Sequence, residues 1–215
     1  MNNDMVRYYA QRALEYERIY AKPERQEDLG RLREYLGSLF QGDDVLEAAC
    51  GTGYWTEVVA RSARSIFATD INEKVLAIAR AKNFGEASVD FLKADSYALP
   101  KFDGLFTAGF GAFWWSHMPK ARIHEFLADF HSHLEPGAKV AFIDNRYIEG
   151  SSTPICRVEE SGDTFQMRTM QDGNLHKVLK NFPSPEELQA AVADFGTDAE
   201  VTLFDYYWLL VYRRN

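Results

Sequence analysis

Residues 45–53 of the chain read Val-Leu-Glu-Ala-Ala-Cys-Gly-Thr-Gly, an apolar strand that runs into a glycine-rich turn. A second apolar run at residues 65–69 ends in a carboxylate, Asp70. Glycine allows positive φ and close approach to a ligand, and a strand-to-helix turn sets its amides at the carboxyl edge of a sheet. An acid about 20 residues further on is placed to accept hydrogen bonds from ribose hydroxyls. The pattern predicts a site for an adenosine-containing cofactor.

Two details of this turn argue against a dinucleotide. Thr56 stands where the third glycine of a G-x-G-x-x-G motif would pack the helix. Glu47 ends the first strand, and a carboxylate there would repel a pyrophosphate. The same carboxylate suits the cationic methionine end of S-adenosylmethionine, so NAD is the weaker interpretation.

Residues 47–53, together with Asp70, resemble the nucleotide-binding motifs of the class I S-adenosylmethionine-dependent methyltransferases. The likeness spans roughly residues 41–144 and resumes in the last strands. It implies S-adenosyl-L-methionine as cofactor and S-adenosyl-L-homocysteine as product. One departure is Ala49, where many members have the first of three glycines; alanine is a mild change there if its φ is negative.

The 215 residues suffice for one α/β domain. We expect a single domain with a helical lid (residues 1–40), a cofactor-binding half (41–144) and a substrate-side half carrying a β-hairpin insertion (145–215). Apolar runs are too short for a membrane span, no signal peptide is visible, and two cysteines make no disulfide framework, so the expected location is cytoplasmic. A net charge of −8 argues against DNA as a partner. We expect a monomer or a homodimer.

Strands and helices alternate after residue 42, which predicts a doubly wound, mostly parallel sheet with helices on both faces. The resemblance implies seven strands, with the final strand antiparallel. The expected strands lie near residues 43–48, 65–69, 88–93, 103–108, 138–144, 164–170, 175–179, 201–204 and 207–212. The expected helices lie near residues 8–20, 23–40, 53–63, 72–82, 119–133 and 185–194. An Asp-Gly turn at residues 171–174 predicts a hairpin.

Cofactor-binding residues are expected where the strands end, because ligands of such sheets bind outside the carboxyl ends. Ile71 can pack on the adenine, and Asp95 resembles the family acid that accepts from the adenine amino group, with a helix cap as the alternative. In related small methyltransferases a tyrosine or arginine of an amino-terminal helix can reach the cofactor carboxylate; the alternative is an ordinary amphipathic helix. The predicted cofactor-binding residues are Arg12, Tyr16, Glu47, Ala49, Gly51, Thr52, Gly53, Asp70, Ile71, Asp95, Ser96 and Gly109.

His117 is the candidate general base, because its ordinary pKa near neutrality suits proton removal from an amine or a hydroxyl. The alternative is a histidine that caps the helix beginning near Pro119. The segment before it is unusually aromatic, and aromatic faces attract cations or form a flat apolar pocket, although core packing explains them as well. The predicted substrate-binding residues are Tyr9, Phe110, Phe113, Trp114, Arg146 and Tyr147.

Asp144 and Asn145 raise the question of a metal, because catechol-type methyltransferases hold a divalent cation with such a pair and an acid after the fourth strand. Here that acid is missing, and two oxygen donors on one loop make a poor cation site, so no metal is expected. Arg146 is then free to pair with Asp144 or to bind a substrate carboxylate. Residues 107–110 also lack the Asn/Asp-Pro-Pro-Tyr/Phe motif of enzymes that methylate glutamine or nucleobases.

The predicted function is methyl transfer from S-adenosylmethionine to a nitrogen or oxygen nucleophile of a small molecule, with an aromatic or amine acceptor favoured. The reaction is an in-line displacement that mainly requires positioning, so a nucleophilic triad is not needed. Three alternatives stay open. They are a transfer-RNA or protein methyltransferase, a non-catalytic S-adenosylmethionine-binding module, and an enzyme that uses the cofactor or its decarboxylated form for another transfer, such as aminopropyl transfer.

Overall fold

The computed structural model describes residues 8–10, 12–169 and 173–215, and the side chains of all of these except residues 14–16. These residues form a seven-stranded sheet of order β3-β2-β1-β4-β5-β10-β9 and a separate three-stranded sheet. The strands of the large sheet are β1 (Asp44–Ala48), β2 (Ser65–Asp70), β3 (Ser88–Lys93), β4 (Phe106–Ala112), β5 (Leu134–Asn145), β9 (Gly196–Leu203) and β10 (Tyr207–Arg214). Only β10 among them runs antiparallel to its neighbours, which confirms the predicted fold class.

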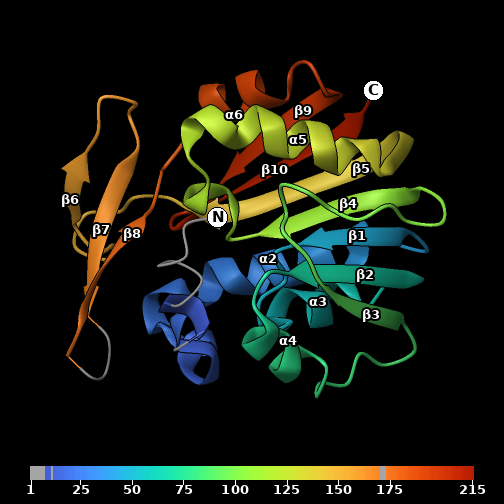
Figure 1. Cartoon of the computed structure of the whole chain (residues 1–215), viewed down its shortest axis with the longest axis horizontal. Helices are drawn as coiled ribbons and strands as arrows, with labels where there is room; N and C mark the ends of the chain where they lie inside the picture. The colour runs from blue at the N-terminus through green and yellow to red at the C-terminus, as the bar shows by residue number, and fades with distance from the viewer. Residues whose placement is uncertain (1–7, 11, 170–172) are drawn as a thin grey trace.

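The large sheet is covered on both faces, as its apolar strands require. Val45 of β1 belongs to a buried cluster with α2 (Gln26–Leu39), α3 (Tyr54–Val59) and α4 (Glu73–Ala79). The next residue, Leu46, belongs to the opposite cluster with α5 (Ile123–Ser132) and α6 (Pro185–Val192). Figure 1 shows these two sets of helices on opposite sides of the sheet. Among the described residues, no helix is long and apolar enough to cross a membrane.

The strands differ from the predicted ones in several places, and β5 begins at Leu134 rather than near residue 138. β4 runs over Phe106–Ala112 rather than residues 103–108, because Gly104 turns the chain with a φ of 115° before it. β6 (Ile155–Val158) was not predicted, since its residues are mostly exposed and lack an apolar alternation. β9 begins at Gly196 rather than near residue 201, as a largely exposed edge strand. The predicted 171–174 turn lies partly outside the described residues, between β7 (Thr164–Thr169) and β8 (Leu175–Leu179).

The helix predicted at residues 8–20 is α-helical at residues 8–10 and 12 and continues as the 3₁₀ helix η1 (Ala13–Ala21). The helix predicted at residues 23–40 begins with a short 3₁₀ helix, η2 (Pro23–Arg25), before α2. Glu17 fastens η1 to the core: its carboxylate accepts from the Thr52 hydroxyl at 2.8 Å and from Lys82 Nζ at 2.7 Å. Tyr20 stacks on Tyr54 with ring centroids 4.1 Å apart. The segment therefore rests on the glycine-rich turn, while its role as a lid stays a prediction.

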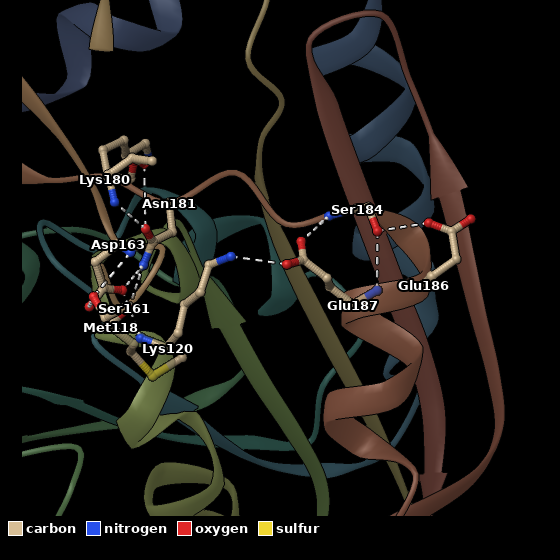
Figure 2. Close-up of polar contacts among 10 residues, drawn as sticks. Met118, Lys120, Ser161, Asp163, Lys180, Asn181, Ser184, Glu186 and Glu187 are labelled. Carbon is tan, nitrogen blue, oxygen red and sulfur yellow. Dashed lines mark hydrogen bonds and ion pairs between the residues drawn. The ribbon is translucent and has the colours of Figure 1, made fainter. Parts of the chain in front are cut away.

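The three-stranded sheet β6-β7-β8 stands to one side of the large sheet (Figure 1) and is anchored by buried polar side chains. Asp163, just before β7, accepts from the Lys120 amide and from Asn181 Nδ2, both at 2.9 Å. Asn181 also donates to the Met118 carbonyl at 2.9 Å and accepts from the Thr164 amide at 2.8 Å. Figure 2 shows this network, and beside it the link from Lys120 to Glu187 at the start of α6. The network holds the segment after β8 against the loop that carries His117.

Replacing Asn181 with alanine should lower the free energy of unfolding by about 1–3 kcal/mol, because Asp163 and the Thr164 amide lose a buried partner. Denaturant unfolding followed by circular dichroism measures the change. A matched control is Gln189→Ala, an exposed amide that donates to the Ala199 carbonyl at 3.2 Å; its effect should stay within about 0.5 kcal/mol. Equal effects of the two substitutions would contradict an anchoring role for Asn181.

Candidate active site

The glycine-rich turn leaves β1 with three residues in the left-handed region. Their φ angles are 54° at Ala49, 58° at Gly51 and 77° at Gly53. The condition under which alanine would be a mild change at position 49, a negative φ, is therefore not met. Ala49 adopts the left-handed conformation that favours glycine, which strains the backbone there. A Cβ on Gly53 would lie 3.1 Å from that of Ala79, so a side chain there would push against α4. The turn is thus built close to its neighbours with its amides at the sheet edge.

Glu47 is buried at the end of β1, with 1% of its surface exposed. Neither carboxylate oxygen has a hydrogen-bond partner among the described residues. Burial raises the pKa of Glu47 to about 8, against a lowering by the nearby Thr56 hydroxyl, and the charge of Asp70 raises it further. A buried carboxyl without a partner is costly unless a cation or a donor meets it. This orphaned group fits the cationic methionine end of S-adenosylmethionine.

Asp70 ends β2 and ties that strand to the glycine-rich turn. Its two oxygens accept from the Gly51 amide at 3.0 Å and from the Asn72 amide at 2.8 Å. Burial raises the pKa of Asp70 to about 6, while these backbone donors lower it. Each carboxylate oxygen has two lone pairs, so both can still accept from a ligand. Its contact with the ribose hydroxyls stays a prediction.

The other residues expected at the cofactor lie at or near the carboxyl edge, with one exception. Thr52 and Ser96 are buried, and Ile71 is half-buried. Asp95 accepts a hydrogen bond from the Tyr97 amide at 3.1 Å. The residues that follow Asp95 form a turn and not a helix, so the alternative that Asp95 caps a helix is wrong. The side chain of Tyr16 is not among the described side chains, so its contact with the cofactor stays a prediction.

Gly109 is the exception. It lies in the middle of β4, paired in register with Leu46, and a Cβ there would stand 2.7 Å from the Phe130 ring. Its hydrogen atom faces α5 and not the carboxyl edge of the sheet. The expected cofactor role for Gly109 is therefore wrong: this glycine lets α5 approach β4 closely.

A cavity of about 460 Å³ opens beside the turn, between η1, the ends of β4 and β5, and the three-stranded sheet. It is lined by Tyr8, Tyr9, Arg12, Ile19, Tyr20, Lys22, Arg25, Phe113, His117, Asn145, Ser151, Ser152, Thr153, Gln166, Met167, Arg168, Thr169, Lys180, Phe182 and Tyr207. Of the predicted residues, it brings together Tyr9, Arg12, Phe113 and His117. Phe113 lies in the left-handed region with a φ of 57°, unusual for an aromatic residue.

His117 is buried in the cavity wall with both ring nitrogens engaged. Nδ1 lies 2.7 Å from the Leu179 carbonyl and Nε2 lies 2.7 Å from the Tyr9 hydroxyl. A carbonyl only accepts, so Nδ1 carries the proton and Nε2 accepts from Tyr9. Burial holds the pKa of His117 well below its usual range, and the charge of Lys180 lowers it further. The imidazole is therefore neutral, with its basic nitrogen covered by Tyr9.

Lys180, which sequence reasoning missed, forms a buried ion pair with Asp144 at the end of β5. Its Nζ lies 2.9 Å from an Asp144 oxygen and 2.6 Å from the Ser116 hydroxyl. The Ser116 amide donates to the other Asp144 oxygen at 2.9 Å. Arg146 points away from Asp144 and donates to the carbonyl of Phe204. The prediction that Arg146 pairs with Asp144 or with a substrate carboxylate is therefore wrong.

Three more of the predicted substrate residues do not line this cavity. Phe110 is fully buried and packs edge-on against Phe40 of α2, with centroids 5.8 Å apart. Tyr147 is 38% exposed and packs on Phe182. Trp114 packs against Tyr97 and lines a second cavity, of about 480 Å³, on the other side of His117. The core-packing alternative therefore holds for Phe110, whose strand continues four residues beyond its predicted end.

Among the described residues, no group of three histidine, cysteine, aspartate or glutamate side chains could hold a metal ion. The expectation of a metal-free site stays a prediction.

Comparisons with known proteins agree with this architecture. A family model described as "Methyltransferase domain" matches residues 45–137. A malonyl-[acyl-carrier protein] O-methyltransferase of Serratia marcescens is 27% identical over 154 residues, covering 70% of this chain and 53% of that protein. The chain spans about half the length of the curated relatives it matches.

Two solved structures superpose over almost the whole chain. They are described as "DhpI-SAH complex structure" and "DhpI-SAM-HEP complex", and each has a TM-score of 0.77 and covers 99% of this chain and 96% of its own. Their sequence identities to this chain are 28% and 27%.

In its fold and in the turn with its two buried acids, the chain resembles the class I S-adenosylmethionine-dependent methyltransferases, and these similarities support that family. The residues of the turn fit S-adenosylmethionine, which the description of one similar structure names.

The raised pKa of Glu47 predicts a stability that depends on pH. The folded protein keeps a proton on Glu47 up to about pH 8, while the unfolded chain releases it near the ordinary value of 4.5. Stability from this group therefore falls as pH rises between those values. Asp70 contributes in the same direction only up to about pH 6. Above pH 6 the Glu47→Gln protein should gain thermal stability relative to the wild type as pH rises.

Differential scanning fluorimetry of the ligand-free protein across this range measures the melting temperature. Glu34→Gln makes the same chemical change at an exposed position of α2 and should follow the wild-type pH dependence. A constant difference between Glu47→Gln and wild type at all pH values would show that the Glu47 carboxyl titrates normally.

Proposed function

We propose that this chain transfers the methyl group of S-adenosylmethionine to an oxygen or nitrogen nucleophile of a small molecule held in the cavity beside the turn. The observation that carries the proposal is the position of the cavity. Phe113, in its wall, directly follows β4, and the Phe113 ring lies 6.0 Å from Trp55 in the helix that leaves the turn. The volume of about 460 Å³ is within the range of small-molecule sites.

The residues at the turn support binding of the cofactor next to this cavity. Glu47 is protonated in the empty site, and a sulfonium or ammonium group beside it would favour its charged form. The Asp70 carboxylate retains acceptor capacity for ribose hydroxyls. Arg12 lines the cavity and donates a hydrogen bond to the Tyr8 hydroxyl. The Arg12 guanidinium is therefore held in the cavity, where it can pair with the carboxylate of the cofactor. We assign the cofactor carboxylate to Arg12 on this ground.

The reaction asks little acid–base chemistry of the protein. An acceptor atom must be held in line with the methyl carbon, which is a matter of positioning. Where the acceptor carries a proton, His117 is the residue placed to receive it through the Tyr9 hydroxyl, which lies 2.7 Å from Nε2. Its neutral state is the one that a base requires.

Two observations argue against the alternatives. A transfer-RNA or protein substrate calls for a basic surface, whereas the basic side chains here gather inside a cavity of an acidic chain. A non-catalytic cofactor-binding module would have no use for an acceptor cavity of this size. The Serratia relative is named as an O-methyltransferase, which supports transfer of the methyl group to oxygen.

Calorimetric titration with S-adenosylmethionine and S-adenosylhomocysteine tests the proposal directly. We expect micromolar binding of both ligands by the wild-type protein, and a loss of at least about tenfold in Asp70→Asn, because each charge-assisted hydrogen bond contributes about 1.5–3 kcal/mol. The matched control is Asp90→Asn, an exposed carboxylate on the neighbouring strand β3, which should bind as the wild type does. A folded wild-type protein that binds neither ligand would overturn the proposed function.

A further inference from the structure

The cavity is basic, although the chain as a whole carries a net charge of −8. None of its described lining residues is an aspartate or a glutamate. Its basic members come from four separate segments of the chain. They are Arg12, Lys22, Arg25, His117, Arg168 and Lys180.

Arg25 is a buried member of this set whose described partners carry no charge. It is only 7% exposed, and no carboxylate of the described residues lies within ion-pair distance of it. Its guanidinium donates to Asn145 Oδ1 at 3.2 Å and to Ser151 Oγ at 3.0 Å, and its Nε has no hydrogen-bond partner among the described residues. Glu24 accepts a hydrogen bond from Ser151 Oγ at 3.2 Å, and the Arg25 guanidinium lies over the rings of Tyr206 and Tyr207, 5.1 and 5.7 Å from their centroids. A buried cation with neutral partners alone is costly, so the site is incomplete without an anion.

Lys180 lies close to Arg25 through a short chain of contacts. Arg25 donates to Asn145, Asn145 Nδ2 donates to Asp144 at 2.9 Å, and Lys180 donates to the same Asp144 oxygen at 2.9 Å. An ammonium group has three N–H donors, and contacts to Asp144 and Ser116 use two of them. Asp144 is fully buried and balances Lys180, but it does not reach the cavity lining.

Arg168 brings a further guanidinium from β7 to the cavity lining. Its Nη2 donates to Gln166 Oε1 at 3.0 Å, and both residues line the cavity. The charge of Arg168 lowers the pKa of Lys180, after the larger lowering by burial, and so does the charge of Arg25. The three cations therefore face a common volume.

We propose that the methyl acceptor is an oxyanion, a phosphonate, phosphate monoester or carboxylate group of a small molecule, held by Arg25, Arg168 and Lys180 and methylated on oxygen. This assignment rests on the proposed function. Guanidinium groups bind such groups through paired N–H donors, which also fixes their orientation. Protonated amines and other cations are repelled from the same volume.

The transfer balances without a proton. A lone pair of the acceptor oxygen forms the new O–C bond to the methyl carbon, the C–S bond breaks, and its electron pair stays on sulfur. The sulfonium becomes a neutral thioether and the oxyanion loses one negative charge. No base is required on this route, and the covered Nε2 of His117 is in keeping with that. His117 then serves to hold the Tyr9 hydroxyl at the cavity wall.

Binding of the acceptor oxyanion by these residues is distinguished from binding of the cofactor carboxylate by the following experiment. The protein is loaded with S-adenosylhomocysteine and titrated with inorganic phosphate, methylphosphonate and acetate as oxyanion probes, and with acetamide and methylamine as uncharged and cationic probes. Probes of about five non-hydrogen atoms can reach a Kd of about 1 mM in a matched site. We expect an oxyanion to bind in that range and acetamide and methylamine not to bind. Comparing the affinities of phosphate and methylphosphonate with that of acetate then distinguishes a phosphorus oxyanion from a carboxylate as the bound group.

The variants Arg25→Gln and Arg168→Gln should each weaken oxyanion binding at least about tenfold, as expected for loss of one charge-assisted pair, and leave the affinity for S-adenosylhomocysteine unchanged. Arg25→Lys should restore part of the loss. The matched control is Arg157→Gln, an exposed arginine on β6 that lies 3.4 Å from Glu159 and outside the cavity. Its oxyanion affinity should equal that of the wild type.

Three results would overturn the inference while sparing the proposed function. They are oxyanion affinity unchanged in both cavity variants, binding of acetamide or methylamine as strong as that of the oxyanions, and no probe binding at millimolar concentration by protein that binds S-adenosylhomocysteine. A loss of S-adenosylhomocysteine affinity in Arg25→Gln or Arg168→Gln would assign that arginine to the cofactor instead. Failure of the wild-type protein to bind S-adenosylhomocysteine at all would overturn the proposed function itself.

Discussion

The ion pair between Lys180 and Asp144 is the contact on which the geometry of the cavity depends. Asp144 ends β5 of the large sheet, and Lys180 follows β8 of the three-stranded sheet, so their 2.9 Å contact joins the two. Breaking such a buried pair by removing one partner costs about 3–5 kcal/mol, because the other charge is left alone. Ser116, one residue before His117, donates its amide to the same carboxylate. A single carboxylate thus sets the positions of the sheet junction, the lysine and the histidine loop together.

Two more buried acids stand on the other side of the site, at the ends of β1 and β2. Burial raises the pKa of both, to about 8 for Glu47 and about 6 for Asp70. Backbone amides donate hydrogen bonds to the Asp70 carboxylate and compensate its burial, whereas neither Glu47 oxygen has a hydrogen-bond partner among the described residues. Ala49 adds local strain with its φ of 54°. Such features reduce the stability of the empty protein and are compatible with a bound cation that relieves them.

The fold and the cofactor turn were predictable because their determinants are local. The apolar run, the glycines and Asp70 occur in one stretch, and the alternation of strands and helices fixes a parallel sheet. The position of Gly109 was not predictable, since the start of β4 depends on the turn at Gly104 and on packing against α5. Phe110 follows Gly109 in β4, so its place in the core depends on the same turn and packing.

The acceptor cavity could not be derived from sequence, because its charged residues share no pattern. Arg25 lies in a short 3₁₀ helix, Arg168 in β7, and Lys180 after β8. Each is unremarkable alone, and each is brought to the others by the junction between the two sheets. Arg146, which stood next to Asp144 in sequence, was the more obvious partner, yet the antiparallel pairing of β10 with β5 carries it toward the Phe204 carbonyl instead.

The distribution of charge across the site is coherent with the chemistry proposed for it. Acids lie on the cofactor side, at the ends of β1 and β2, and the basic side chains lie on the acceptor side. A cationic methyl donor and an anionic acceptor are then each held by opposite charge, and the reaction removes one charge from each. Both attractions weaken once transfer is complete, because the products no longer carry those charges. The same groups that assemble the reactants therefore favour release of the products, and the buried charges of the empty site are the cost of that arrangement.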